Sequence, residues 1–188
     1  YPYGSINYYL QNFFPYLNES RNPDGAFMSA TVLAAAAGNH DLTLGGGVDA
    51  RDLDRTPDSL AYFLLWKQPL NGPLDPDGQN QCKAQGSAER VKDFEDAAGN
   101  AYPRMTNYSF DYGNCHFIVL DANHYMDWTN KQMRDWVEND LKNSKQTWKF
   151  AAFHQPGFNS DFAHWDEQRM RLLSDVFERG GVDIAFAG

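Results

Sequence analysis

The second half of the chain contains short apolar runs separated by polar and glycine-containing segments. These runs predict four strands, at 108–112, 116–121, 148–153 and 182–187. The first two runs are joined through Gly113-Asn114, and this turn sequence predicts that they form a hairpin. The pattern therefore predicts a sheet in this half of the chain.

Between these runs, apolar residues recur every three or four positions, which is typical of amphipathic helices. One helix is expected to open at a capping box formed by Thr129 and Gln132. Another is expected over 166–179, where Gly180-Gly181 would end it. Because helices alternate with strands late in the chain, the pattern predicts a mixed α/β layered domain.

The first half of the chain is less regular. Apolar spacing and a serine cap predict helices at 5–16, 59–66 and 87–98. The segments 42–58 and 67–87 are rich in glycine, proline, aspartate and asparagine, which favours long surface loops. This half is therefore expected to add helices and loops to the sheet of the second half.

One apolar run in the first half, at 31–37, leads directly into Gly38-Asn39-His40-Asp41. Its four alanines alone would favour a helix, but the run is short and ends in glycine, so we predict a buried strand. Ligands in open α/β sheets bind beyond the carboxyl ends of strands, which makes the polar residues after this run candidates for chemistry.

The three polar side chains of this segment could share one task. Asn39 can offer an amide oxygen to a metal, His40 can exchange a proton near neutrality, and Asp41 can orient the imidazole of His40. The alternative is a polar loop that only caps the next turn. His154 is a second candidate, since it ends the predicted strand 148–153 and could bind a metal from a rigid element. A lone histidine there could equally be structural.

Composition limits the possible partners. The 188 residues fit one domain, with 42% hydrophobic residues and no credible internal linker. A formal net charge of −9 argues against a nucleic-acid or anionic-membrane partner, so an anionic substrate would need local positive charge such as bound metal ions. Cys82 and Cys115 are too few for a disulfide framework, and their pairing cannot be read from the sequence.

Three strings together resemble the calcineurin-like metallophosphoesterases in order and spacing. They are Gly38-Asn39-His40-Asp41, the segment 108–121, and Phe153-His154-Gln155-Pro156. The resemblance implies an α/β fold, the layered αββα metallophosphatase sandwich, with a dinuclear metal site. It also implies that Asn39 and His154 bind metal and that His40 is catalytic near the leaving group.

Further positions are similar to the purple acid phosphatase branch of this family. His164 lies ten residues after His154, where that branch has a histidine that faces the substrate phosphate. Tyr1 is a candidate iron ligand, because the branch has a metal-binding tyrosine in the corresponding loop. The alternatives are an exposed loop histidine and an ordinary aromatic residue. Asp41 departs from the branch, which typically has glutamate there. We assign no role to His116 or His124.

Full members of the family also carry Asp-x-His and Gly-Asp blocks upstream and a Gly-His-x-His block downstream, and none of these occurs in the 188 residues. We therefore expect residues 1–188 to be the central part of a single catalytic domain, incomplete at both ends and inactive alone. For the intact protein the resemblance implies hydrolysis of a small phosphate ester with two metal ions, iron together with iron, zinc or manganese. It also implies a secreted or periplasmic location.

Two alternatives remain open at this point. A phosphodiesterase or nucleotide pyrophosphatase could use the same fold, because pocket loops rather than metal motifs decide between them. A metal-free relative that serves as a binding module would explain the missing blocks.

Overall fold

The computed structural model describes residues 4–18, 27–73, 75, 77–160, 162 and 164–188. The described residues belong to two compact units. The first unit is drawn from Tyr1–Ala35, Asn39–Trp66 and Lys83–Gly99, and the second from Ala36–Gly38, Lys67–Cys82 and Asn100–Gly188. The single catalytic domain expected over 1–188 stays a prediction.

The second unit contains a four-stranded sheet in the order β3-β4-β5-β6. Its strands are β3 (Tyr108–Tyr112), β4 (Cys115–Val119), β5 (Trp148–Phe153) and β6 (Ile184–Ala187). β3 and β4 form the predicted antiparallel hairpin, and β5 and β6 continue the sheet in parallel. All four predicted strands are confirmed, with ends that shift by at most two residues.

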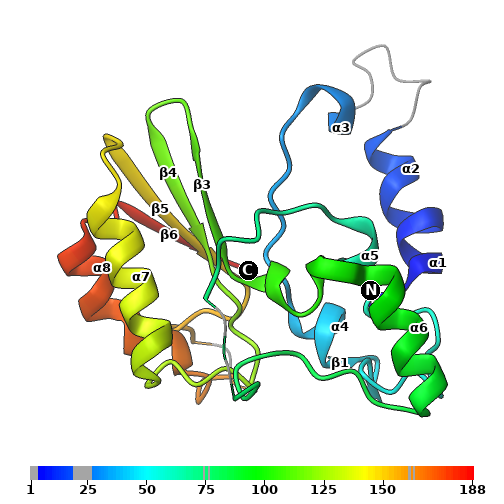
Figure 1. Cartoon of the computed structure of the whole chain (residues 1–188). Helices are drawn as coiled ribbons and strands as arrows, with labels where there is room; N and C mark the ends of the chain where they lie inside the picture. The colour runs from blue at the N-terminus through cyan, green and yellow to red at the C-terminus, as the bar shows by residue number, and fades with distance from the viewer. Residues whose placement is uncertain (1–3, 19–26, 74, 76, 161, 163) are drawn as a thin grey trace. The chain divides into compact units, whose positions relative to one another are not determined.

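One face of this sheet is covered by α7 (Lys131–Asn143) and α8 (Ser174–Gly180), which lie beside each other in Figure 1. Their buried side chains pack on the residues of β4 and β5 that face them. The resulting core includes Ile118, Leu120, Trp128, Met133, Val137, Leu141, Ala151, Leu173 and Val176. Gly180 allows a close approach of the two helices, because a Cβ there would lie 2.6 Å from Cδ1 of Leu141.

The start of α7 differs from the prediction by one residue. Its N-cap is Asn130, whose side-chain oxygen accepts hydrogen bonds from the main-chain N–H of Gln132 and Met133 at 2.9 and 3.2 Å. Thr129 instead donates its hydroxyl to Asp127. The capping box was therefore wrong, because asparagine is at least as good an N-cap as threonine and stood one residue closer to the helix.

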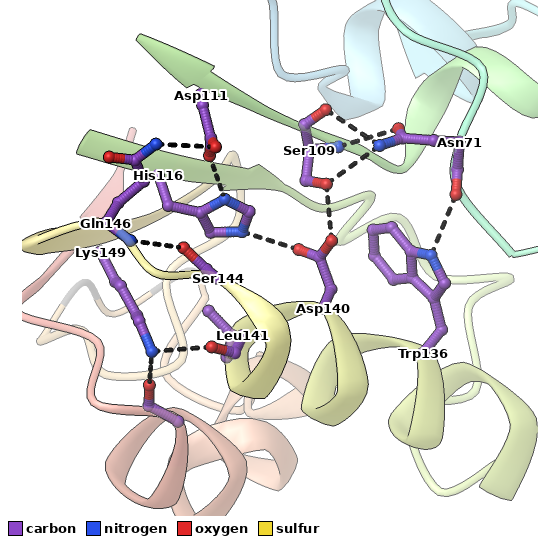
Figure 2. Close-up of polar contacts among 11 residues, drawn as sticks. Asn71, Ser109, Asp111, His116, Trp136, Asp140, Leu141, Ser144, Gln146 and Lys149 are labelled. Carbon is purple, nitrogen blue, oxygen red and sulfur yellow. Dashed lines mark hydrogen bonds and ion pairs between the residues drawn. The ribbon is translucent and has the colours of Figure 1, made fainter. Parts of the chain in front are cut away.

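The predicted helix at 166–179 is shorter than expected. A 3₁₀ turn at Arg169–Leu173 precedes α8, and Gly181 ends α8 in the left-handed region at φ 71°, as the glycine pair predicted. Lys149 donates from Nζ to the main-chain oxygens of Leu141, at 2.7 Å, and Gly180, at 2.9 Å (Figure 2). One ammonium group therefore serves the carboxyl ends of both α7 and α8, where the helix dipoles favour positive charge.

The first unit is mainly helical. The predicted helix at 5–16 is present as three consecutive pieces. The helices predicted at 59–66 and 87–98 are also present, and both are shorter than predicted. The unit contains α1 (Ile6–Tyr8), a π-helical turn (Tyr9–Phe13), α2 (Phe14–Leu17), α3 (Phe27–Ala30), α4 (Asn39–Leu42), α5 (Tyr62–Leu65) and α6 (Ala88–Ala98). Two strands of two residues, β1 (Leu44–Gly45) and β2 (Val48–Asp49), pair within the predicted loop 42–58, and strands this short leave no period in the sequence.

The strand predicted at 31–37 is not present. This segment is extended but pairs with no strand among the described residues, and Val32 is 67% exposed. The main-chain oxygen of Ala35 accepts a hydrogen bond from the hydroxyl of Tyr62 at 2.9 Å. A side-chain hydroxyl thus bonds to a carbonyl group that would have bonded to a neighbouring strand in a sheet. The length of the apolar run alone could not distinguish a strand from this unpaired segment.

Cys82 and Cys115 do not form a disulfide with each other. In the described part of the chain, no helix has the length and apolar character needed to cross a membrane.

Candidate functional site

His154 lies where the sequence predicted it, directly after the last residue of β5. Its main-chain oxygen accepts a hydrogen bond from the N–H of Gly188 at 3.0 Å, just beyond β6. Its imidazole lies against Gly38: a Cβ at position 38 would be 2.8 Å from Cδ2 of the ring and 3.1 Å from Cγ. Glycine at position 38 is therefore required by the packing of His154, a reason that the sequence did not reveal.

Asn39 follows Gly38 in the chain and opens α4 rather than a loop after a strand. The main-chain oxygen of Asn39 accepts from the N–H of Thr43 at 2.9 Å and from its hydroxyl at 3.2 Å. The side chains of Asn39 and His40 are both half-buried. The expected strand is thus replaced by an extended segment and one helical turn, whereas the roles predicted for Asn39 and His40 stay predictions.

Asp41 is buried in the first unit, with 6% of its surface exposed. Its Oδ1 accepts a hydrogen bond from the hydroxyl of Tyr9 at 3.0 Å, and that hydroxyl accepts one from Nε1 of Trp66 at 3.1 Å. Gly4 fits closely beside it, because a Cβ at Gly4 would lie 2.8 Å from Oδ1 of Asp41. Asp41 therefore joins elements distant in sequence, and its predicted role in orienting His40 stays a prediction.

His164 lies in the exposed segment after β5. Its main-chain oxygen accepts hydrogen bonds from Nδ2 of Asn159 at 2.9 Å and from the N–H of Glu167 at 3.0 Å. These contacts hold the backbone of His164, and the residue as a whole is exposed. Its predicted role toward phosphate stays a prediction. Tyr1, the predicted iron ligand, lies outside the described residues.

A different histidine, His116, lies in a network of polar contacts within the second unit (Figure 2). Its Nδ1 lies 2.7 Å from Oδ1 of Asp111 in β3, and its Nε2 lies 2.8 Å from Oδ2 of Asp140 in α7. Ionised carboxylates only accept hydrogen bonds, so this geometry favours the imidazolium form of His116, in which both ring nitrogens donate. Burial alone would lower the pKa of His116, but the bonds to Asp140 and Asp111 outweigh it and raise the pKa.

Neighbouring side chains extend this arrangement. Ser109 donates its hydroxyl to Oδ1 of Asp140 at 2.8 Å, and Asn71 bonds both the main chain and the hydroxyl of Ser109. Gln146 donates to Asp111 at 2.8 Å, and this bond, followed by that from His116, lowers the pKa of the Asp111 carboxyl. The contacts join the β3–β4 hairpin to α7.

Sequence reasoning also missed a buried polar cluster near His154. Asp121 and Asn123, both fully buried, follow β4, and Nε2 of Gln155 donates to Oδ1 of Asn123 at 3.4 Å. Oε1 of Gln155 is buried and has no hydrogen-bond partner among the described residues. The available signal was the string Asp121-Ala122-Asn123, since polar residues just beyond a buried apolar strand need partners.

The described residues include two of the predicted metal donors, Asn39 and His154. In the described ranges, no three His, Cys, Asp or Glu side chains gather in a way that would hold a metal ion. The imidazole of His154 nevertheless lies against Gly38, the residue before Asn39, and the buried acceptor of Gln155 follows His154 in the chain. Imidazole nitrogen and amide oxygen are donors that suit iron, zinc or manganese, so these residues fit the predicted metals.

The chain is similar in sequence and in fold to known proteins. The chain is 29% identical over 123 residues to purple acid phosphatase 23 of Arabidopsis thaliana, a match that covers 60% of the chain and 26% of the relative. It is 31% identical over 86 residues to purple acid phosphatase 15 of the same plant, covering 43% of the chain and 16% of the relative. Over part of its length, the chain is thus similar in sequence to purple acid phosphatases.

The resemblance to purple acid phosphatases that the motifs predicted is therefore confirmed. Among solved structures, the purple acid phosphatase PPD1 from yellow lupin (Lupinus luteus) seeds matches 81% of the chain and 24% of its own length, with a TM-score of 0.50 and 19% identity. This likeness confirms the mixed α/β fold and shows the fold alone. No protein-family model matches the chain. The chain spans about a quarter or less of the length of the curated relatives that it matches.

Proposed function

We propose that the protein is a phosphoric ester hydrolase, an acid-phosphatase-like phosphomonoesterase that uses a dinuclear metal site. The observation that carries the proposal is the contact of the His154 ring with Gly38, within a chain related to purple acid phosphatases. This contact brings the predicted ligand at the end of β5 next to the residue that precedes the predicted ligand Asn39. Gly38 belongs to the first of the motifs that suggested the family, and His154 belongs to the last of them.

In this proposal, Asn39 and His154 are metal ligands, and Tyr1 is an iron ligand. Iron paired with iron, zinc or manganese, when bound, would neutralise phosphate charge and lower the pKa of water. The chain has a formal net charge of −9, so such local positive charge is needed for an anionic substrate.

The remaining candidates would act on the substrate itself. His40 and His164 would donate hydrogen bonds to phosphoryl oxygens, and one of them would protonate the leaving alcohol. The exposed imidazole of His164 suits such a task, because an anion can reach it from solvent. Asp41 would stabilise the orientation of His40. A secreted or periplasmic location, as predicted from the resemblance, belongs to the proposal as well.

The test compares the 188-residue chain with the full reading frame from which it comes. Each is loaded with iron, zinc or manganese and assayed with p-nitrophenyl phosphate and with bis(p-nitrophenyl) phosphate between pH 4 and 8. We expect the full protein to hydrolyse the monoester faster than the diester, and His154→Ala or Asn39→Ala to reduce kcat at least a hundredfold. His124→Ala is the matched control, since His124 is an exposed histidine that carries no predicted role.

Preferential cleavage of the diester would replace the phosphatase by a phosphodiesterase. If the full protein binds no metal and cleaves neither ester, the hydrolase proposal is wrong and a metal-free binding module takes its place. If His154→Ala keeps full activity while the wild type is active, the assignment of His154 as a ligand is wrong.

A further inference from the structure

A buried polar cluster lies at the carboxyl end of β4, within the second unit. Asp121 is fully buried, and its N–H donates to Oδ1 of Asn107 at 2.8 Å. Its carboxylate accepts from the hydroxyl of Tyr125 and twice from Asn123, and its main-chain oxygen accepts from Nε1 of Trp128 at 3.1 Å. Buried carboxylates persist only with such partners, so Asp121 provides a rigid base at this end of the sheet.

Asn123 is held firmly on this base. Both its N–H and its Nδ2 donate to Oδ1 of Asp121 at 2.9 Å. The side chain is fully buried and has little freedom to turn, because rotation of the amide would bring its oxygen toward the Asp121 carboxylate. The orientation of the amide is thus determined by Asp121.

From this fixed orientation, Asn123 contacts two other segments. Its Nδ2 donates to the main-chain oxygen of Gly38 at 3.4 Å, and its Oδ1 accepts from Nε2 of Gln155 at 3.4 Å. Gly38 immediately precedes Asn39, and Gln155 immediately follows His154. One buried amide therefore bonds to the chain neighbours of both predicted metal ligands, in segments separated by more than a hundred residues of sequence.

We propose that Asn123 is a positioning residue, which orients the segments that carry Asn39 and His154 before a metal binds. This inference rests on the proposed function. Asn123 itself touches neither the metal nor the substrate in this proposal. Outer partners of this kind orient metal ligands, and their loss typically weakens metal binding roughly 10-fold to 100-fold.

The geometry favours positioning over a contribution to stability alone. The bonds from Asn123 to Gly38 and Gln155 are longer than its bonds to Asp121, so each of them adds little stability by itself. The two bonds instead fix the positions of Gly38 and Gln155. The ring of His154 packs against Gly38, so a shift of Gly38 would move the surface on which the ring lies.

The test uses Asn123→Ala with Asn107→Ala as the matched control. Asn107 is also a buried asparagine that bonds to Asp121. Among the described residues, its hydrogen bonds do not reach Gly38 or Gln155. Without metal, amide hydrogen exchange is followed by NMR in both variants of the 188-residue chain. We expect exchange at Gly38 and Gln155 to accelerate at least tenfold in Asn123→Ala relative to Asn107→Ala, while the amides of β4 and β5 change equally in both.

The second measurement is the zinc dissociation constant of the full protein, by competition with a chelating dye. We expect Asn123→Ala to weaken zinc binding 10-fold to 100-fold and Asn107→Ala to change it less than threefold. Should Asn123→Ala not fold, Asn123→Ser, which keeps a donor toward Asp121, is measured with the same expectations.

The outcomes separate this inference from the proposed function. If the wild-type protein binds no zinc, iron or manganese, the proposed function fails and this inference fails with it. If the wild type binds metal, but Asn123 and Asn107 variants show equal exchange and equal affinity, the positioning role is overturned and the proposed function stands.

Discussion

The protonated His116 predicts an unusual dependence of stability on pH. The variant His116→Gln removes the imidazolium between Asp111 and Asp140. The glutamine amide can donate to one carboxylate, but its carbonyl oxygen would then face the other. The variant should therefore lose stability in acid, where the wild-type histidine carries its charge.

The size of this loss follows from the exposure of the two partners. The Asp140 side chain is 19% exposed, so its bond to a charged histidine should contribute about 1.5–3 kcal/mol. The Asp111 side chain is 52% exposed, and solvent screening reduces its contribution to about 0–1 kcal/mol. We expect a total loss of roughly 1.5–4 kcal/mol, which corresponds to a decrease in Tm of roughly 3–16 °C for a chain of this length.

The sign of the pH dependence is determined by the raised pKa of folded His116. A group whose pKa is higher in the folded state stabilises the protein fully below its unfolded pKa, about 6.5 for histidine. This contribution disappears as the pH rises through the folded pKa. The difference in stability between wild type and His116→Gln should thus be largest near pH 5 and shrink above pH 6.5.

The assay is urea denaturation of both proteins from pH 5 to pH 8, followed by tryptophan fluorescence, with an NMR titration of the His116 ring. Asp140→Asn and Asp111→Asn form a matched pair, because they make the same change at a mostly buried and at a half-exposed partner. Asp140→Asn should cost more at pH 5. A loss that stays constant with pH, or grows toward pH 8, would refute a protonated His116.

Three further changes test packing and capping. Gly38→Ala places a Cβ 2.8 Å from the ring of His154 and should cost roughly 1–3 kcal/mol in urea denaturation, with a shifted His154 ring resonance. Gly180→Ala places a Cβ 2.6 Å from Cδ1 of Leu141 and should destabilise by a similar amount, and Leu141→Ala in the same chain should reduce this added cost in a double-mutant cycle, although the Cβ of residue 141, at 2.9 Å, remains. Asn130→Ala removes the N-cap of α7 and should lower the free energy of unfolding by about 1 kcal/mol, whereas an unchanged midpoint would contradict the capping geometry.

The sheet of the second unit could be predicted because each strand has an apolar run of its own and the hairpin has its turn residues. The conformation of residues 31–37 could not be predicted in this way. An apolar run becomes a strand only where a partner strand is available, and the residues of the run do not show whether one is. The predicted capping residue of α7 was wrong because Thr129 and Asn130 are both favourable N-cap residues. Only the structure shows that Asn130 accepts the hydrogen bonds.

Some residues of the candidate site could likewise be predicted from the sequence, and others could not. His154 was located correctly from its place after an apolar run, and His164 and Asn39 were suggested by spacing and by resemblance. The contacts of Asn123 with Gly38 and Gln155 could not be found in this way, because they join segments far apart in the chain through single side-chain bonds. The same holds for His116, whose charge depends on two carboxylates brought to it by a different strand and a helix.

The sequence by itself thus determined the family resemblance, the α/β class, the four strands and the order of the chemical motifs, because these depend on residues close to one another in the chain. Only the tertiary structure decided why position 38 is glycine, which histidine is protonated and which buried amide lies beside the predicted ligands. Those features depend on distances between segments, and such distances are determined only when the chain packs.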